Sequence, residues 1–143
     1  MPLTMMKLLL TVLIGVLFTF SAFAQGDWTD FYKDQIATIQ YRYMDCHRPE
    51  DGIHRQEILL RFANLTQKAV TITYHKQISY NNNPANQPSA ENTFTVTLKP
   101  GEVLEGSCGL KDKRLYIFVK MLDGTSQSVL TAFDLVNIKV TQN

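Results

Sequence analysis

The sequence predicts an all-β protein, specifically an antiparallel sandwich of about seven strands, from three patterns that recur along it. Apolar and polar residues alternate over short stretches, turn residues separate these stretches, and no long stretch has the apolar spacing of a helix. The 143-residue chain is expected to hold one such domain, over residues 25–143, after a leader at residues 1–24.

The leader has the features of a cleaved secretory signal peptide. Lys7 supplies a positive charge, an uncharged apolar run follows from Leu8 to Phe20, and Ala22 and Ala24 provide the small residues of a cleavage site. The run is shorter than the roughly 20 residues that a membrane span requires. We therefore expect cleavage, a secreted or periplasmic protein, and no membrane insertion afterwards.

The clearest strands lie on either side of a short turn at residues 64–68. In each strand every second residue is apolar and most residues between are polar, which places one side of the strand against a core. The expected core residues are Ile58, Leu60, Phe62, Val70, Ile72 and Tyr74, and the opposite side carries Glu57, Arg61, Thr71 and Thr73.

Five further segments predict strands, at residues 35–43, 93–98, 103–108, 114–122 and 129–140. The segment at residues 114–122 is continuously apolar and rich in β-branched and aromatic residues. This composition predicts a central strand that is covered on both faces.

Two polar or mixed segments interrupt or precede these strands. Residues 44–55 are polar and contain Pro49 and the pair Asp51-Gly52, which predicts a loop. Residues 26–34 contain Trp28, Phe31 and Tyr32, and their spacing fits either a short helical turn or an extended arm at the edge of the core.

Two turns have a recognisable composition. Asn64-Leu65-Thr66 separates two strands, and Leu98-Lys99-Pro100-Gly101-Glu102 follows another, with Gly101 expected to adopt a positive φ angle. This order resembles a general immunoglobulin-like sandwich of exported bacterial proteins, in which N-x-T and L-x-P-G-E turns are frequent. The resemblance covers about half of the exported part, and it implies a fold and no activity.

The two cysteines, Cys46 and Cys108, both lie in the exported part of the chain. An even number of cysteines in an oxidising compartment predicts a disulfide. Closing a loop of this length would stabilise the fold by about 4 kcal/mol in the loop-entropy model. A metal site or a catalytic thiol is a weaker interpretation, because the chain has no C-x-x-C pair.

The charge balance excludes an electrostatic mode of binding. Without Lys7 the exported part is formally neutral, and its densest basic run, Lys111-Asp112-Lys113-Arg114, contains an acid. Nucleic-acid binding and attachment to a membrane surface are therefore not expected. The sequence also contains no motif for a cofactor, and it leaves the oligomeric state open.

Enzymatic chemistry has only one candidate region. His47 and His54 lie in the predicted loop at residues 44–55 together with Asp45, Cys46, Glu50 and Asp51, a composition that could bind zinc or copper. The segment Gly106-Ser107-Cys108-Gly109 lacks the G-x-S-x-G pattern of a nucleophile. The third histidine, His75, falls on the polar side of its strand. A small metal-dependent or hydrolytic enzyme is thus the alternative function.

A binding or structural role without catalysis is the favoured function. The longest loop, residues 80–90, is uncharged and rich in Asn and Pro, so it could present hydrogen-bonding groups with a small loss of entropy. Its candidate contacts to a protein, peptide or glycan are Tyr80, Asn81, Asn82, Asn83 and Asn86. The other interpretation of this loop is a solvated connection between the sheets.

Overall fold

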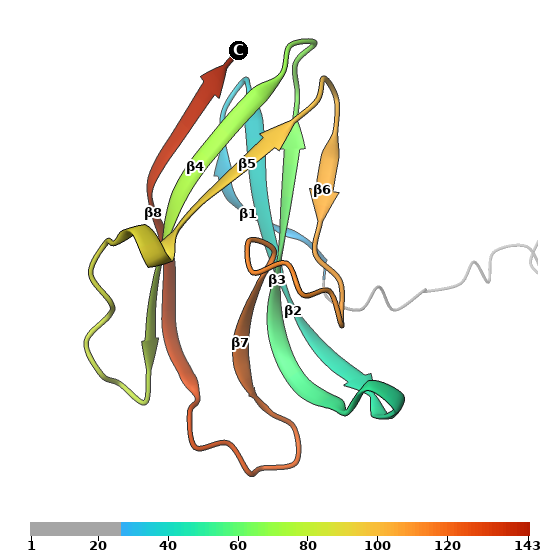
Figure 1. Cartoon of the computed structure of the whole chain (residues 1–143), viewed down its shortest axis with the longest axis vertical. Helices are drawn as coiled ribbons and strands as arrows, with labels where there is room; N and C mark the ends of the chain where they lie inside the picture. Colours follow the sequence, from blue (N-terminus) through green and yellow to red (C-terminus); the bar gives the residue numbers. More distant parts are fainter. Residues whose placement is uncertain (1–26) are drawn as a thin grey trace, which may run out of the picture.

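The computed structural model describes residues 27–143, and over these residues the protein is all-β, with eight strands in two antiparallel sheets (Figure 1). The predicted signal peptide at residues 1–24 lies outside the described part. No helix within residues 27–143 is long and apolar enough to cross a membrane. The elements are β1 (Thr29–Lys33), β2 (Ala37–Arg48), η1 (Pro49–Asp51), β3 (Ile53–Asn64), β4 (Val70–Tyr80), η2 (Ala90–Asn92), β5 (Thr93–Leu98), β6 (Val103–Glu105), β7 (Tyr116–Met121) and β8 (Leu130–Gln142).

The first sheet contains β1, β2 and β3, and its fourth position is shared by β6 and β7. Both of these strands pair with β3, β6 at its C-terminal end and β7 nearer its N-terminal end. The chain leaves the sheet between them at Gly106, where a Cβ atom would lie 2.4 Å from the carbonyl oxygen of Leu115. A side chain at Gly106 would therefore displace the backbone that begins β7.

The second sheet has the order β5-β4-β8, and its apolar side chains meet those of the first sheet in one core. Leu60 and Ile72 are fully buried, whereas Arg61 and Thr73 are partly exposed, so the predicted phase of both strands is confirmed. The fully buried core residues are Ala37, Ile39, Ile58, Leu60, Phe62, Val70, Ile72, Tyr74, Val96 and Leu98.

Asn64 joins the two turns that the sequence singled out. Its side-chain amide donates to the carbonyl oxygens of Lys68 (2.7 Å) and Lys99 (2.9 Å). Its side-chain oxygen accepts hydrogen bonds from the backbone N–H (2.9 Å) and the hydroxyl (2.8 Å) of Thr66. Gly101 has a φ of 69°, as predicted, and its N–H donates to the Thr66 carbonyl. The N-x-T turn thus ties both sheets together at one end.

The predicted disulfide is confirmed, because Cys46 and Cys108 are bonded with their Cα atoms 5.4 Å apart. The bond fastens the segment after β6 to β2. Close to it, the carboxylate of Glu57 is only 1% exposed and accepts a hydrogen bond from the Arg55 side chain at 2.6 Å. The alternation predicted the side of β3 on which Glu57 lies, but not that the side chain is buried there.

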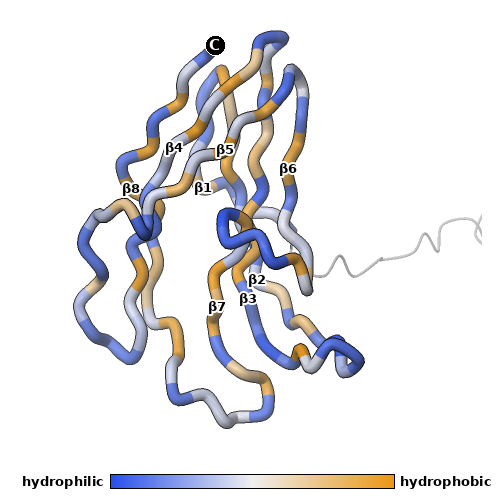
Figure 2. Tube along the Cα trace, viewed as in Figure 1, coloured by the Kyte–Doolittle hydropathy of each residue, from blue (hydrophilic) through white to orange (hydrophobic). Residues whose placement is uncertain are grey.

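The prediction of a loop at residues 44–55 is wrong over most of that range. Strands β2 and β3 form one long hairpin that reaches Arg48 on one side and begins again at Ile53 on the other, so only residues 49–52 turn. This end of the hairpin extends beyond the core, and Figure 2 shows that most of it is hydrophilic. Polarity there marks the end of a hairpin whose residues, apart from the buried Cys46, are exposed or partly exposed.

Two further expectations need correction. Segment 114–122 is not a central strand: in the part of the chain that the structure describes, β7 pairs with β3 alone and has a free edge. The segment at residues 26–34 adopts the extended alternative, as β1. Phe31 and Tyr32 pack against the core, and Trp28 lies under Arg42, whose Cζ is 4.6 Å from the ring centroid.

Replacing Leu60 by alanine is expected to lower the free energy of unfolding by roughly 2–5 kcal/mol, because it leaves a cavity between the sheets. Replacing Thr73 by alanine is expected to cost less than about 1 kcal/mol, because its side chain is partly exposed. Chemical denaturation of both variants measures the difference. Equal losses would contradict the burial of one side of each strand.

Candidate functional site

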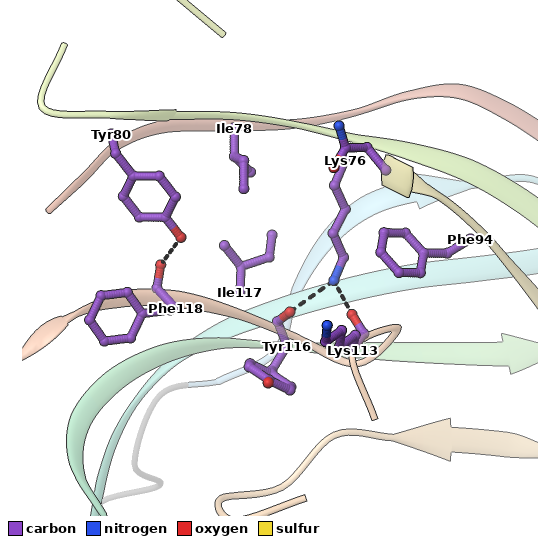
Figure 3. A pocket seen from close by; sticks show the side chains of 9 residues that line it. Lys76, Ile78, Tyr80, Phe94, Lys113, Tyr116, Ile117 and Phe118 are labelled. Atoms are coloured by element: carbon purple, nitrogen blue, oxygen red, sulfur yellow. Dashed lines mark hydrogen bonds between the residues drawn. The ribbon is translucent and has the colours of Figure 1, made fainter. Parts of the chain in front are cut away.

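A pocket of about 200 Å³ opens where the edge of the first sheet faces the second sheet (Figure 3). Its walls come from β4 on one side and β7 on the other, with β5 and the end of η2 beside them. Most of the lining is apolar or aromatic. The lining residues are Lys76, Ile78, Tyr80, Asn92, Phe94, Lys113, Tyr116, Ile117 and Phe118.

The period of two in β4 places the pocket side chains of that strand. Tyr74 faces the core, so Lys76, Ile78 and Tyr80 follow it on the same side of the sheet and point towards β7, as Figure 3 shows for the last three. Lys76 and Tyr80 have polar ends, and they face β7, which belongs to the other sheet. These polar ends therefore need hydrogen-bond partners at β7.

Backbone carbonyl groups at and before β7 supply these partners. The Tyr74 hydroxyl donates to the carbonyl of Arg114 (2.5 Å), and the Tyr80 hydroxyl donates to that of Phe118 (2.7 Å). Between them, the Lys76 ammonium donates to the carbonyl of Tyr116 (2.8 Å) and to that of Lys113. We call these four bonds the β4–β7 bridge.

The bridge protects the free edge of β7. An unpaired edge strand offers its carbonyl and N–H groups to other chains. Because Tyr116 and Phe118 direct their carbonyl groups to Lys76 and Tyr80, two acceptors at this edge are already used within the protein. Addition of a foreign strand at this edge would have to break the bridge.

Lys76 is an unusual component of this wall, because its side chain is buried and no acid among residues 27–143 forms an ion pair with it. The residue is 6% exposed, and its Nζ lies 4.6 Å from the centroid of the Phe94 ring. Burial lowers the pKa of Lys76 to about 8, an effect that the charge of Asp112 partly opposes. Asp112 is held by Arg114 at 2.7 Å, and this hydrogen bond is the main reason that the pKa of Asp112 is lowered. A cation–π contact and two carbonyl groups thus replace a counter-ion.

The loop at residues 80–90 covers an edge that β5 leaves open. The Asn86 side chain accepts a hydrogen bond from the Ile78 N–H (2.7 Å) and donates to the Lys76 carbonyl (3.1 Å), and its own N–H donates to the Ile78 carbonyl. Asn86 therefore takes the place of a neighbouring strand along the second half of β4. This contact gives the loop a structural role.

The other predicted contacts of this loop divide into two groups. The Asn81 side chain is engaged, because it accepts from the Val129 N–H (3.0 Å) and donates to the Gln127 carbonyl (2.9 Å). The hydroxyl of Tyr80 belongs to the β4–β7 bridge. Asn82 and Asn83 are exposed. These two side chains, and the ring of Tyr80 that lines the pocket, remain available to a partner.

The structure brings His47 and His54 together but leaves the nearby acids apart from them. Asp45 accepts a hydrogen bond from Gln56 (2.9 Å), and Glu50 and Asp51 pair with Arg48. Within residues 27–143, no group of three or more His, Cys, Asp or Glu side chains is placed to hold a metal ion.

His75 lies on the predicted side of β4, together with Thr71 and Thr73, but it is buried there. Its side chain is 1% exposed, and neither ring nitrogen has a hydrogen-bond partner among the described residues. Thr93 pairs with His75 at the start of β5, directly after η2, which contacts β4. The alternation of residues within β4 could not predict these contacts around His75.

A second, more polar groove lies beside the disulfide, with a volume of about 530 Å³. Two arginines line it, but Arg48 pairs with Asp51 at 3.1 Å and Arg55 pairs with Glu57 at 2.6 Å. Because their charges are largely compensated, this groove is a weaker candidate for an anion site than its composition indicates.

The sequence interpretation missed Lys76 and the apolar pocket around it. A signal was present, since a lysine continues the core-facing phase of Tyr74 and precedes Ile78 and Tyr80 in the same phase. A lysine in such a register must either end the buried part of the strand or find partners inside. Nothing in the sequence showed that β7 would provide them.

The chain matches no protein-family model, and comparisons with curated proteins and with solved structures give no significant match. The function therefore has to be argued from the geometry of the site.

Replacing Asn86 by alanine is expected to lower the free energy of unfolding by about 1–3 kcal/mol, because the Ile78 N–H and the Lys76 carbonyl lose their partners. The same change at Asn83 should alter it by less than about 0.5 kcal/mol. Urea denaturation measures both. A loss at Asn83 as large as that at Asn86 would show that the edge contact is not what stabilises the loop.

The burial of Lys76 predicts a stability that rises with pH. In the unfolded chain the pKa of this lysine is 10.5, whereas burial lowers it to about 8 in the folded protein. Between these values the unfolded state binds the additional proton, so the free energy of unfolding increases above pH 8, with a slope approaching about 1.4 kcal/mol per pH unit.

This increase should be measured up to a pH of about 9.5, before the tyrosines of the unfolded chain ionise. The variant Lys76→Met is expected to lose the increase, because it has no group that titrates at this position. Identical slopes in the wild type and the variant would contradict a lowered pKa for Lys76.

Proposed function

We propose that this protein is a non-enzymatic exported module that binds a partner through the pocket between β4 and β7. The observation that supports it is a pocket with mostly apolar walls, formed by residues such as Ile78, Phe94 and Ile117. Ligand pockets in proteins are typically of this kind, with a few fixed polar groups. An apolar side chain of a protein or peptide would be the best occupant.

The polar groups of the pocket support binding more than catalysis. The Lys76 ammonium and the Tyr80 hydroxyl donate to backbone carbonyls, so neither is positioned to exchange a proton with a ligand. A glycan would require free donors and acceptors for its hydroxyl groups, and these two residues offer few. A protein or peptide partner is therefore favoured over a glycan.

The alternative function, a small metal-dependent or hydrolytic enzyme near residues 44–55, has less support. Such an enzyme needs an ionisable group that activates water or a nucleophile beside the histidines. Asp45, Glu50 and Asp51 are engaged with Gln56 or Arg48. At this end of the hairpin the two histidines contact each other, and none of these three acids is placed beside them.

The proposal includes the location and the finer class of the fold. The disulfide supports an oxidising compartment, so the periplasm or the outside of the cell is the proposed location. Two antiparallel sheets with a common core support an immunoglobulin-like sandwich, a fold that often presents binding residues at its edges and loops.

The test is capture of a partner from the native cell envelope by the purified protein. The variant Asn92→Trp places a large side chain at the rim of the pocket, where Asn92 makes one side-chain hydrogen bond, to Ser89 at 3.2 Å. This variant is expected to lose about 90% or more of the captured partner, a loss that corresponds to a tenfold weaker affinity. The amount retained is measured by quantitative mass spectrometry.

The matched control is Asn83→Trp, which adds the same side chain at the exposed tip of the loop. It should capture the partner as the wild type does, and both variants should keep the thermal stability of the wild type. Normal capture by Asn92→Trp would show that the pocket is not the binding site. Loss in Asn83→Trp alone would assign recognition to the loop instead.

A further inference from the structure

His47 and His54 face each other at the end of the β2–β3 hairpin, away from the pocket described above. They are directly opposite in the register of the two strands. Their Nδ1 atoms lie 2.5 Å apart, and their ring centroids lie 4.5 Å apart with the rings tilted by 70°. The two nitrogens are hydrogen-bonded to each other, and the tautomer decides which one donates, so two potential ligand atoms converge on one small volume at an exposed contact.

The backbone accounts for this closeness. The His54 carbonyl accepts a hydrogen bond from the N–H of Leu122, on the β7 side of β3. Its backbone groups therefore point away from β2, and the two histidines form a non-hydrogen-bonded pair. In such pairs the Cα atoms are about 4.5 Å apart and the side chains approach most closely.

The turn beyond the histidines keeps the pair in register. Gly52 adopts a φ of 67° and donates its N–H to the Pro49 carbonyl, so the hairpin closes within four residues. The disulfide at Cys46, the residue next to His47, fastens the same strand to the rest of the fold. The site is thus preorganised, and little order would have to be created on binding.

We propose that His47 and His54 form a two-imidazole site for a divalent transition-metal ion, with copper(II) the preferred ion. Imidazole nitrogen is a good ligand for copper, nickel and zinc, and copper(II) binds most tightly among them. Both rings ligate through Nδ1, and the single ring proton of each neutral imidazole then resides on Nε2. No other protein group has to change its protonation state.

The surroundings leave the other coordination positions to water. Arg48 points its guanidinium group to Asp51 and to the Cys108 carbonyl. Asp123 lies near enough to His54 for their charges to interact, but its carboxylate accepts two hydrogen bonds from Thr125. An exposed ion held by two imidazoles would therefore keep open positions for water or for a ligand.

The experiment is titration of the purified protein with copper(II), followed by calorimetry and by electron paramagnetic resonance. One equivalent of copper(II) should bind, and the spectrum should show coupling to two nitrogen nuclei. The variants His47→Asn and His54→Asn should each bind about tenfold more weakly or worse, because the second imidazole acts at a high effective concentration. The double variant should lose at most about twice the binding free energy that either single variant loses, because the two histidines form one site.

The control variant Glu50→Gln changes an exposed acid of the same turn and should bind copper(II) as the wild type does. Because His47 and Glu50 are exposed and His54 is partly exposed, the variants should fold normally, which circular dichroism checks. Equal binding by the wild type and the double histidine variant would overturn the proposal, as would a spectrum with one coordinated nitrogen. Neither result would bear on the pocket between β4 and β7, which the variant Asn92→Trp tests separately.

Discussion

The hydrogen bonds from β4 side chains to the carbonyl groups at β7 are the interaction on which the functional part of the structure depends. They join the two sheets at an edge where no strand ladder connects them. The same bonds keep the pocket walls in place, bury Lys76 and protect the free edge of β7. A lysine without a counter-ion would normally be expelled to the surface, because burying an unpaired charge is costly. Here the ring of Phe94 and two carbonyl dipoles make its burial tolerable.

Those parts of the fold that rest on local patterns could be predicted from the sequence. Alternation identified Leu60 and Ile72 as core residues because a strand with one side against the core has a period of exactly two residues. The turn at Asn64 could be recognised because its residue types determine its hydrogen bonds over a few positions. The disulfide followed from the count of cysteines and the expected compartment.

The parts that depend on pairing between distant strands could not be predicted. Polar residues 44–48 indicated a loop, although they extend a hairpin beyond the core, where a strand has no reason to be apolar. The loop composition made Asn86 a candidate contact for a partner but gave no sign that its side chain takes the place of a neighbouring strand of β4. The meeting of His47 and His54 depends on the strand register, which sets them opposite each other only once the turn is known to span residues 49–52.

The position of β8 has a consequence for how the protein reaches its folded state. Val70 pairs with Gln142, so the second sheet joins residues that lie far apart in the chain. The β2–β3 hairpin closes a short turn and can form early, whereas β4 can pair with β5 first and gains its other neighbour, β8, only from the end of the chain. Until β8 joins, one side of β4 has no neighbouring strand, and this open edge is a template for pairing with other chains.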